Sequence, residues 1–165
     1  MEENKKTLIT WLNDAYSMEE SIADTLEGMI EDAEDYPEFK TQLEDHLEQT
    51  KSQAERVRGE IERLGGDVST VKKMMADAMG SIQAVVPDMA KDKVIKNAIA
   101  GHATEHLEMA SYMALAAAAD ELGETETADV CRKIMEEEKE MGKKTEKMLP
   151  EIVKQYLRKQ KEMAE

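Results

Sequence analysis

The sequence predicts an all-α fold, and its composition, its sparse helix breakers and its length lead to that prediction. Aromatic residues, which favour β-strands, make up only 4% of the chain. The residues Ala, Glu, Lys, Leu and Met, which favour helices, dominate. Glycine and proline occur at few places, so the segments between them are long. A chain of 165 residues has the usual length of one domain. We therefore expect one helical domain that spans residues 1–165.

The positions of glycine and proline divide the chain into four long helices. The predicted helices span residues 5–33, 37–64, 92–122 and 125–149, and a further helix is expected after Pro150. The connection over residues 65–91 is much longer than the other two and contains a predicted short helix at residues 71–85. Two tight antiparallel hairpins joined by a long crossover are the ferritin-like form of the four-helix bundle, whereas equal short loops indicate a simple up-down bundle. The predicted fold is therefore a ferritin-like four-helix bundle.

Charge and hydropathy exclude several classes of partner. The formal net charge of −15 would repel phosphate backbones, and no stripe of Lys and Arg offsets it, so nucleic-acid binding is not expected. No apolar run has the length of a membrane span, and the first residues lack the features of a signal peptide. A single cysteine, Cys131, fits a reducing compartment. We expect a cytoplasmic protein without membrane contact. Its excess of acidic residues is expected mainly to form a solvated surface.

Three predicted helices carry a glutamate at the centre of the apolar stripe that faces the core. At about 100° per residue, Glu19 lies in the stripe of the first helix, Glu105 in that of the third and Glu138 in that of the fourth. Each glutamate is close to the middle of its helix, and in an antiparallel bundle the middles of all helices share one level. The three carboxylates should therefore converge.

The charge of these glutamates needs compensation if they are buried. A single inward glutamate is more often a snorkelling or ion-paired residue, but no Lys or Arg lies on any of the three stripes. Protons or a metal ion must then neutralise the carboxylates. Oxygen-rich ligand sets suit manganese or iron, especially when imidazole is added. The three glutamates therefore indicate a carboxylate metal site.

All three histidines of the chain lie near the level of these glutamates. His46 is on the inward side of the second helix, His102 is in the stripe of the third, and His106 is on the flank of that helix. A lone inward histidine is more often a hydrogen-bonded core residue than a ligand, but the converging carboxylates favour a ligand role for His46 and His102. The role of His106 stays open.

The second helix lacks an acid at its central inward position, which Thr50 occupies. Thr50 and Gln53 have the inward geometry there and are candidates to support the site, whereas Glu48 points away. On the third helix, Glu108 follows Glu105 at a spacing of three residues and so faces a similar direction. Glu108 is therefore a secondary candidate ligand.

Two tyrosines border the predicted site. Tyr16 lies about one turn from Glu19, and Tyr112 lies about two turns from Glu105. Either phenol could orient a ligand or relay an electron, while core packing with a satisfied hydroxyl is at least equally expected. Both tyrosines are candidates for supporting residues beside the metal ligands.

Four groups of residues in the predicted helices resemble the YciE/YciF-type bacterial stress proteins of the ferritin-like superfamily. They are residues 14–19, residues 46–50 with Gln53, residues 105–112 and residues 136–139, and the resemblance covers residues 8–150. The resemblance implies a ferritin-like bundle, usually dimeric, with a two-metal carboxylate site and a role in stress responses.

The sequence departs from this family at two positions near the predicted site. Gly142 stands where family members often carry an aspartate, and His102 stands where a glutamine or another non-histidine residue is common. Losing a carboxylate and gaining an imidazole preserves the number of ligands and makes the site less negative. The identity and the number of the metal ions are therefore left open.

Three functions remain compatible with these features. The first is a metal-dependent oxidoreductase that acts on oxygen or peroxide, since carboxylates with imidazole bind redox-capable iron or manganese and the bundle excludes bulk water. The second is metal binding or storage without turnover. The third is a metal-free helical stress adaptor whose glutamates are neutralised by protons. A homodimer is also expected, through apolar parts of residues 71–86 or of the helix after Pro150.

Overall fold

The computed structural model describes residues 2–68 and 92–163, and this part of the chain is helical without strands. Its helices are α1 (Glu2–Asp32), α2 (Pro37–Arg63), α4 (Lys93–Glu121) and α5 (Thr125–Glu162). The all-α prediction is confirmed, and the first three predicted helices agree with α1, α2 and α4 to within a few residues. The short helix predicted at residues 71–85 lies outside the described residues.

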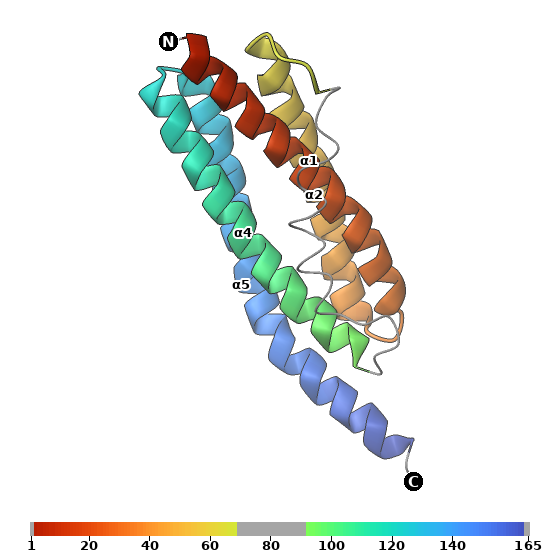
Figure 1. Cartoon of the computed structure of the whole chain (residues 1–165). Helices are drawn as coiled ribbons and strands as arrows, with labels where there is room; N and C mark the ends of the chain where they lie inside the picture. Colours follow the sequence, from red (N-terminus) through yellow and green to blue (C-terminus); the bar gives the residue numbers. More distant parts are fainter. Residues whose placement is uncertain (1, 69–91, 164–165) are drawn as a thin grey trace.

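The helices form two antiparallel hairpins that face each other. Helix α1 packs mainly against α2, and α4 packs mainly against α5. Figure 1 shows that α2 ends and α4 begins at opposite ends of the bundle. The expected ferritin-like arrangement of two hairpins joined by a long connection is therefore confirmed.

Glycines end α2 and α4 in the same way. Gly65 has a φ of 84° and Gly123 has a φ of 72°, a left-handed conformation that glycine adopts without steric cost. After α4, the amide of Glu124 donates to the carbonyl of Ala119 at 2.9 Å and that of Gly123 donates to the carbonyl of Asp120 at 3.0 Å. This pair of bonds is a Schellman motif, which satisfies the last carbonyls of the helix and fixes the position of the turn.

Helix α5 continues through Pro150, so the prediction of a separate helix after this residue is wrong. Proline removes one backbone hydrogen bond, to the carbonyl of Glu146, and both residues lie on the exposed side of the helix, where water can replace that bond. Beyond the proline, Ile152 is buried in the core and Lys159 donates to the backbone carbonyl of Asp35 at 2.7 Å. These contacts with the rest of the bundle hold α5 helical past Pro150.

The apolar core runs along the inward faces of all four helices. Its largest buried apolar side chains include Leu8, Leu12, Met18, Phe39, Ile61, Tyr112, Ile134, Met141 and Ile152. Polar and charged side chains interrupt this core near the middle of the bundle, and they form the site described below. Within the described residues, none of the helices combines the length and the apolarity that crossing a bilayer requires.

Candidate metal centre

Four glutamates are buried together in the middle of the bundle. Glu19 comes from α1, Glu105 and Glu108 from α4, and Glu138 from α5, and each side chain is at most 1% exposed. The helix middles bring them to one level, as the positions of the inward stripes predict. His46 of α2, which is also buried, completes a group that draws on all four described helices.

His46, Glu108 and Glu138 form the tightest part of this group. One ligand atom from each of the three lies within 4.8 Å of the other two. The Nε2 atom of His46 is 3.7 Å from Oε2 of Glu138. This spacing leaves room for one ion to contact an imidazole nitrogen and two carboxylate oxygens. Glu108, the secondary candidate of the sequence analysis, thus lies at the centre of the group.

Glu19 joins the group from the side of α1. Burial raises its pKa to about 8, the hydrogen bond from the Tyr112 hydroxyl to Oε1 of Glu19 lowers it, and the charge of Glu138 raises it. The pKa of Glu108 is also raised well above its ordinary value. Burial is the largest cause, and the charges of Glu19 and Glu138 raise this pKa further. The carboxylates are therefore close enough to repel one another when they are ionised.

Glu105 occupies the side of the group that faces α5. Thr145 donates to Oε1 of Glu105 at 2.7 Å, and Gln42 of α2 donates to the Thr145 hydroxyl at 2.9 Å. The other oxygen, Oε2, lies 3.6 Å from Nδ1 of His102. Burial raises the pKa of Glu105, while the hydrogen bond from Thr145 and the charges of His46 and His102 lower it. Glu105 is thus held through one oxygen and free at the other.

Gly142 lies beside the free oxygen of Glu105. A Cβ atom at position 142 would be 3.5 Å from Oε2 of Glu105, which is an ordinary van der Waals distance. The glycine at position 142, where related sequences often carry an aspartate, therefore lies next to the Glu105 carboxylate. A small cavity of about 10 Å³, the size of one water molecule, lies nearby and is lined in part by His46, Glu105 and Thr145.

Six acceptor atoms of this centre have no hydrogen-bond partner. They are Oε2 of Glu19, Nε2 of His46, Oε2 of Glu105, both carboxylate oxygens of Glu108 and Oε2 of Glu138. Buried acceptors of this kind normally have partners, because each one left alone costs about 1–3 kcal/mol. In the part of the chain that the structure describes, no Lys or Arg forms an ion pair with these carboxylates. The donor set, carboxylate oxygens with an imidazole, is the one that iron and manganese accept.

Several predicted residues lie at the margin of the centre or away from it. His102 is near Glu105 but a third of its side chain is exposed, and the His106 ring is exposed with Nδ1 at 3.0 Å from the His102 carbonyl oxygen. Tyr16 is only partly buried, and the charges that act on it belong to Glu20, Glu55 and Arg58 on the outer surface of α1 and α2. The structure thus places Tyr16 away from the centre, beside charged residues of the outer surface.

Helix α2 contributes polar support where the sequence showed no acid. Thr50 and Gln53 are fully buried, as their inward geometry predicts, and Glu48 is exposed. Gln53 donates through Nε2 to Oε1 of Glu138. Thr145, whose hydroxyl donates to Glu105, was not among the site residues predicted from the sequence. Its spacing of seven residues from Glu138, two turns along one face of α5, is the signal that could have identified it.

Known proteins are similar to this chain in both sequence and fold. The family described as "Domain of unknown function (DUF892)" matches residues 3–158. Protein YciF of Escherichia coli (strain K12) is 30% identical over 146 residues, which are 82% of this chain and 86% of YciF. The crystal structure of a protein from Xanthomonas campestris pv. campestris matches with a TM-score of 0.82 at 34% identity, covering 96% of this chain and 99% of that one. The crystal structure of the Escherichia coli stress protein YciF matches with a TM-score of 0.79 at 25% identity, covering 93% and 99% of the two chains.

Proposed function

This chain belongs to the DUF892 family of YciF-like proteins, and we propose that it binds iron or manganese through Glu19, His46, Glu105, Glu108 and Glu138. The observation that carries this proposal is the group of six buried acceptor atoms without a partner on these five residues. A dication would contact such atoms and offset the repulsion between the carboxylates. The compensation that Lys or Arg provides in ordinary buried ion pairs would then come from the ion.

We propose a centre for two ions, with Glu138 lying between the two sides of the group. The charge of Glu138 raises the pKa values of both Glu19 and Glu105, so this carboxylate neighbours the two sides of the group. Glu108 has two free oxygens and is likewise affected by Glu19, Glu138 and Glu105. His46 and His102 would add one imidazole on either side, although His102 is the more exposed of the two.

The reaction that this centre would support is the reduction of oxygen or peroxide during stress. Bound Fe(II) or Mn(II) would supply the electrons by oxidation to the +3 state, with two ions oxidised for each peroxide reduced to water. The protein would provide binding, orientation and exclusion of water. The water-sized cavity beside His46 and Glu105 favours a substrate of a few atoms over a larger organic molecule. Burial and the charge of Glu19 raise the pKa of Tyr112 well above its ordinary value, so its hydroxyl keeps the proton that it donates to Glu19.

Metal titration combined with a peroxide assay tests this proposal. We expect the purified protein to bind Fe(II) or Mn(II) without oxygen present, and the loaded protein to consume peroxide. Glu138→Gln should abolish both, because the amide keeps the shape of the side chain but removes its charge. Glu48→Gln on the exposed face of α2 is the matched control and should change neither. A parent protein that binds no metal would contradict the proposal, and metal binding without consumption would reduce it to storage.

A metal-free adaptor is the second candidate, and the pKa of Glu19 favours it. A carboxyl with a pKa of about 8 keeps its proton at neutral pH, so protons alone could neutralise part of the group. If the protein is such an adaptor, Glu138→Gln should stabilise it, and no metal should be found in the parent protein.

We also propose that the protein forms a homodimer, as expected from the sequence. Leu157, near the end of α5, is 61% exposed, and this supports an apolar contact beyond Pro150. Analytical ultracentrifugation should give twice the chain mass of 18.6 kDa at micromolar concentration. A Leu157→Glu variant should then sediment as a monomer, and a parent protein that is already monomeric would contradict this part of the proposal.

A further inference from the structure

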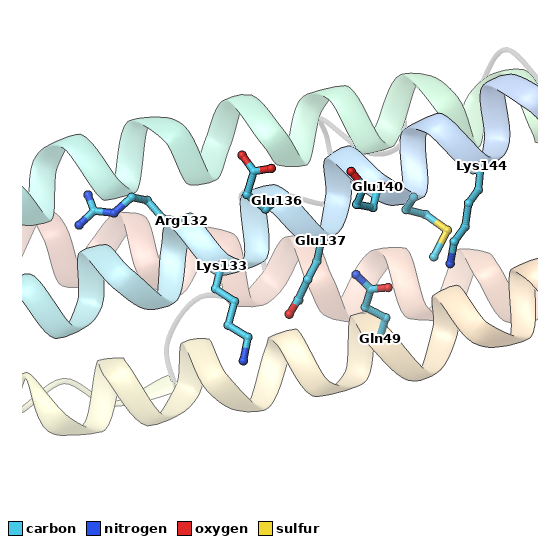
Figure 2. Close-up of a pocket in the computed structure, with 8 residues that line it drawn as sticks. Gln49, Arg132, Lys133, Glu136, Glu137, Glu140 and Lys144 are labelled. Carbon is cyan, nitrogen blue, oxygen red and sulfur yellow. The ribbon is translucent and has the colours of Figure 1, made fainter.

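A groove with a volume of about 610 Å³ is lined by residues of α5 and by Gln49 of α2. Figure 2 shows Gln49 on the α2 side of this groove and Glu137 pointing from α5 toward α2. Glu137 precedes the buried Glu138 in the sequence, but it is partly exposed. The groove therefore brings solvent to the residue adjacent to a proposed ligand.

Arg56, Glu137 and Gln53 form a continuous chain of hydrogen bonds from this groove to Glu138. Arg56 donates from Nη1 to Oε1 of Glu137 at 3.1 Å and from Nη2 to Oε2 of the same carboxylate. Gln53 donates from Nε2 to Oε2 of Glu137 at 3.2 Å and from the same atom to Oε1 of Glu138. One amide group thus joins the exposed ion pair to the buried carboxylate.

This arrangement fixes which way the Gln53 amide points. Both carboxylates can only accept hydrogen bonds, so the end of the Gln53 amide that contacts them must be its NH₂ group. The Oε1 atom of Gln53 therefore has to face the other way. The Oε1 atom is buried and has no partner. Rotating the amide would put an oxygen against two carboxylates, and Arg56 holds one of these, Glu137, by the two-bond contact that suits a guanidinium group.

Gln53 also makes the two oxygens of Glu138 unequal. Oε1 accepts from Gln53, whereas Oε2 has no hydrogen-bond partner and lies 3.7 Å from Nε2 of His46. In Glu108, by comparison, both oxygens are without a partner. Glu138 is therefore prepared to bind an ion through Oε2 alone.

We propose that Arg56 and Glu137 are positioning residues, which hold Gln53 so that Glu138 presents only Oε2 to a bound cation. The proposal rests on the function proposed above. Arg56 has a second effect, because its charge compensates Glu137, a carboxylate adjacent to the buried group. A purely structural ion pair across the α2 and α5 seam would instead affect folding and leave cation binding unchanged.

Binding of Co(II) to the full-length protein tests this proposal, because its visible absorption reports the number and arrangement of ligands. We expect Glu137→Ala and Arg56→Ala to raise the Kd for Co(II) by about 10- to 100-fold, the usual effect of removing a group that orients a ligand. The absorption band should also shift, since Glu138 would be free to bind through both oxygens. Arg56→Lys, which keeps the charge and one hydrogen bond, should restore part of the affinity.

Two variants on the same helices serve as matched controls. Glu136→Ala removes a carboxylate that lines the groove and pairs with Lys139, and Arg58→Ala removes a guanidinium that pairs with Glu55 and Glu62 on the exposed face of α2. Both should bind Co(II) like the parent, with the same absorption.

Three results would overturn the positioning role. If Glu137→Ala binds Co(II) with the Kd and the absorption of the parent, the proposed metal function stands but Glu137 does not position Glu138. If Glu137→Ala and Arg56→Ala both unfold at much lower temperature without metal, and the folded fraction binds normally, the ion pair is structural. If the parent binds no Co(II), Fe(II) or Mn(II), the proposed function fails together with this inference.

Discussion

The Tyr112 hydroxyl donates a hydrogen bond to Oε1 of Glu19, and this bond joins α4 to α1 inside the core. Both side chains are fully buried. The bond lowers the pKa of Glu19, which burial raises to about 8. Tyr112 is therefore the residue that leaves only Oε2 of Glu19 without a partner.

Replacing Tyr112 by phenylalanine should destabilise the metal-free protein. The change leaves Oε1 of Glu19 buried without a donor, which costs about 1–3 kcal/mol. It should also raise the pKa of Glu19 further, because a bond that favours the charged form is lost. Urea unfolding measures the first effect. Tyr16→Phe is the matched control, and it should change stability by less than about 0.5 kcal/mol, because Tyr16 is partly exposed and away from the centre.

The stability of the metal-free protein should fall as the pH rises from about 4.5 to 8. Glu19 has a folded pKa of about 8 against an ordinary value of 4.5, so in this range the folded state binds more protons than the unfolded state. Each such proton changes the free energy of unfolding by about 1.4 kcal/mol per pH unit, and the raised pKa values of Glu105 and Glu108 act in the same direction.

Urea unfolding at pH 5 and at pH 8 checks this dependence. Glu19→Gln should be more stable than the parent at pH 8 and should lose part of the slope, whereas Glu48→Gln should keep all of it. A metal-free parent that becomes more stable between pH 5 and pH 8 would show that the buried carboxylates are not protonated in the folded state.

Replacing Gly142 by aspartate should strengthen metal binding at the side of Glu105. A Cβ atom fits there at 3.5 Å from Oε2 of Glu105, so a side chain can begin at this position without moving the backbone. We expect an affinity gain of about tenfold, because more anionic ligands bind a dication more tightly. Gly142→Asn has the same size without the charge and should show no gain. Equal affinities for the two variants in a metal titration would refute a ligand position at residue 142.

The ligand residues should differ in importance according to their charge and burial. Glu19→Gln, Glu105→Gln and Glu138→Gln should each reduce affinity by more than about 100-fold, beyond the range typical of groups that only orient ligands. His46→Ala should reduce it less, because imidazole adds a ligand without charge, and His102→Ala least, because a third of that side chain is exposed. Isothermal titration with Mn(II) would give this ranking, and equal effects at Glu48 and Glu138 would contradict it.

Helix periodicity predicted the parts of this structure that depend on one helix at a time. The inward stripes identified Glu19, Glu105 and Glu138, because the faces that carry them are apolar around the glutamate. The ends of α2 and α4 follow from Gly65 and Gly123, because the left-handed conformation that ends each helix favours glycine. The single-helix pattern was misleading at Pro150, because the contacts that hold α5 beyond it come from other parts of the bundle, such as Asp35 between α1 and α2.

Contacts between helices could not be derived in this way. Glu108 was a secondary candidate on the basis of its three-residue spacing from Glu105, and only the packing shows that both of its oxygens are buried without a partner. The link from Arg56 through Glu137 and Gln53 crosses the seam between α2 and α5, so it depends on the relative rotation of two helices. Tyr112 reaches Glu19 from a different helix, so this contact likewise depends on the packing of α4 against α1.

The most direct test of the metal centre is anomalous scattering from crystals of the protein loaded with Fe(II) or Mn(II), recorded at the absorption edge of the metal. We predict an anomalous peak in contact with Nε2 of His46, Oε2 of Glu138 and a carboxylate oxygen of Glu108, the group whose ligand atoms lie within 4.8 Å of one another. Crystals of Glu138→Gln grown in the same way should lack this peak. A folded parent protein with no anomalous density among these three residues, after equilibration with excess metal, would contradict the account.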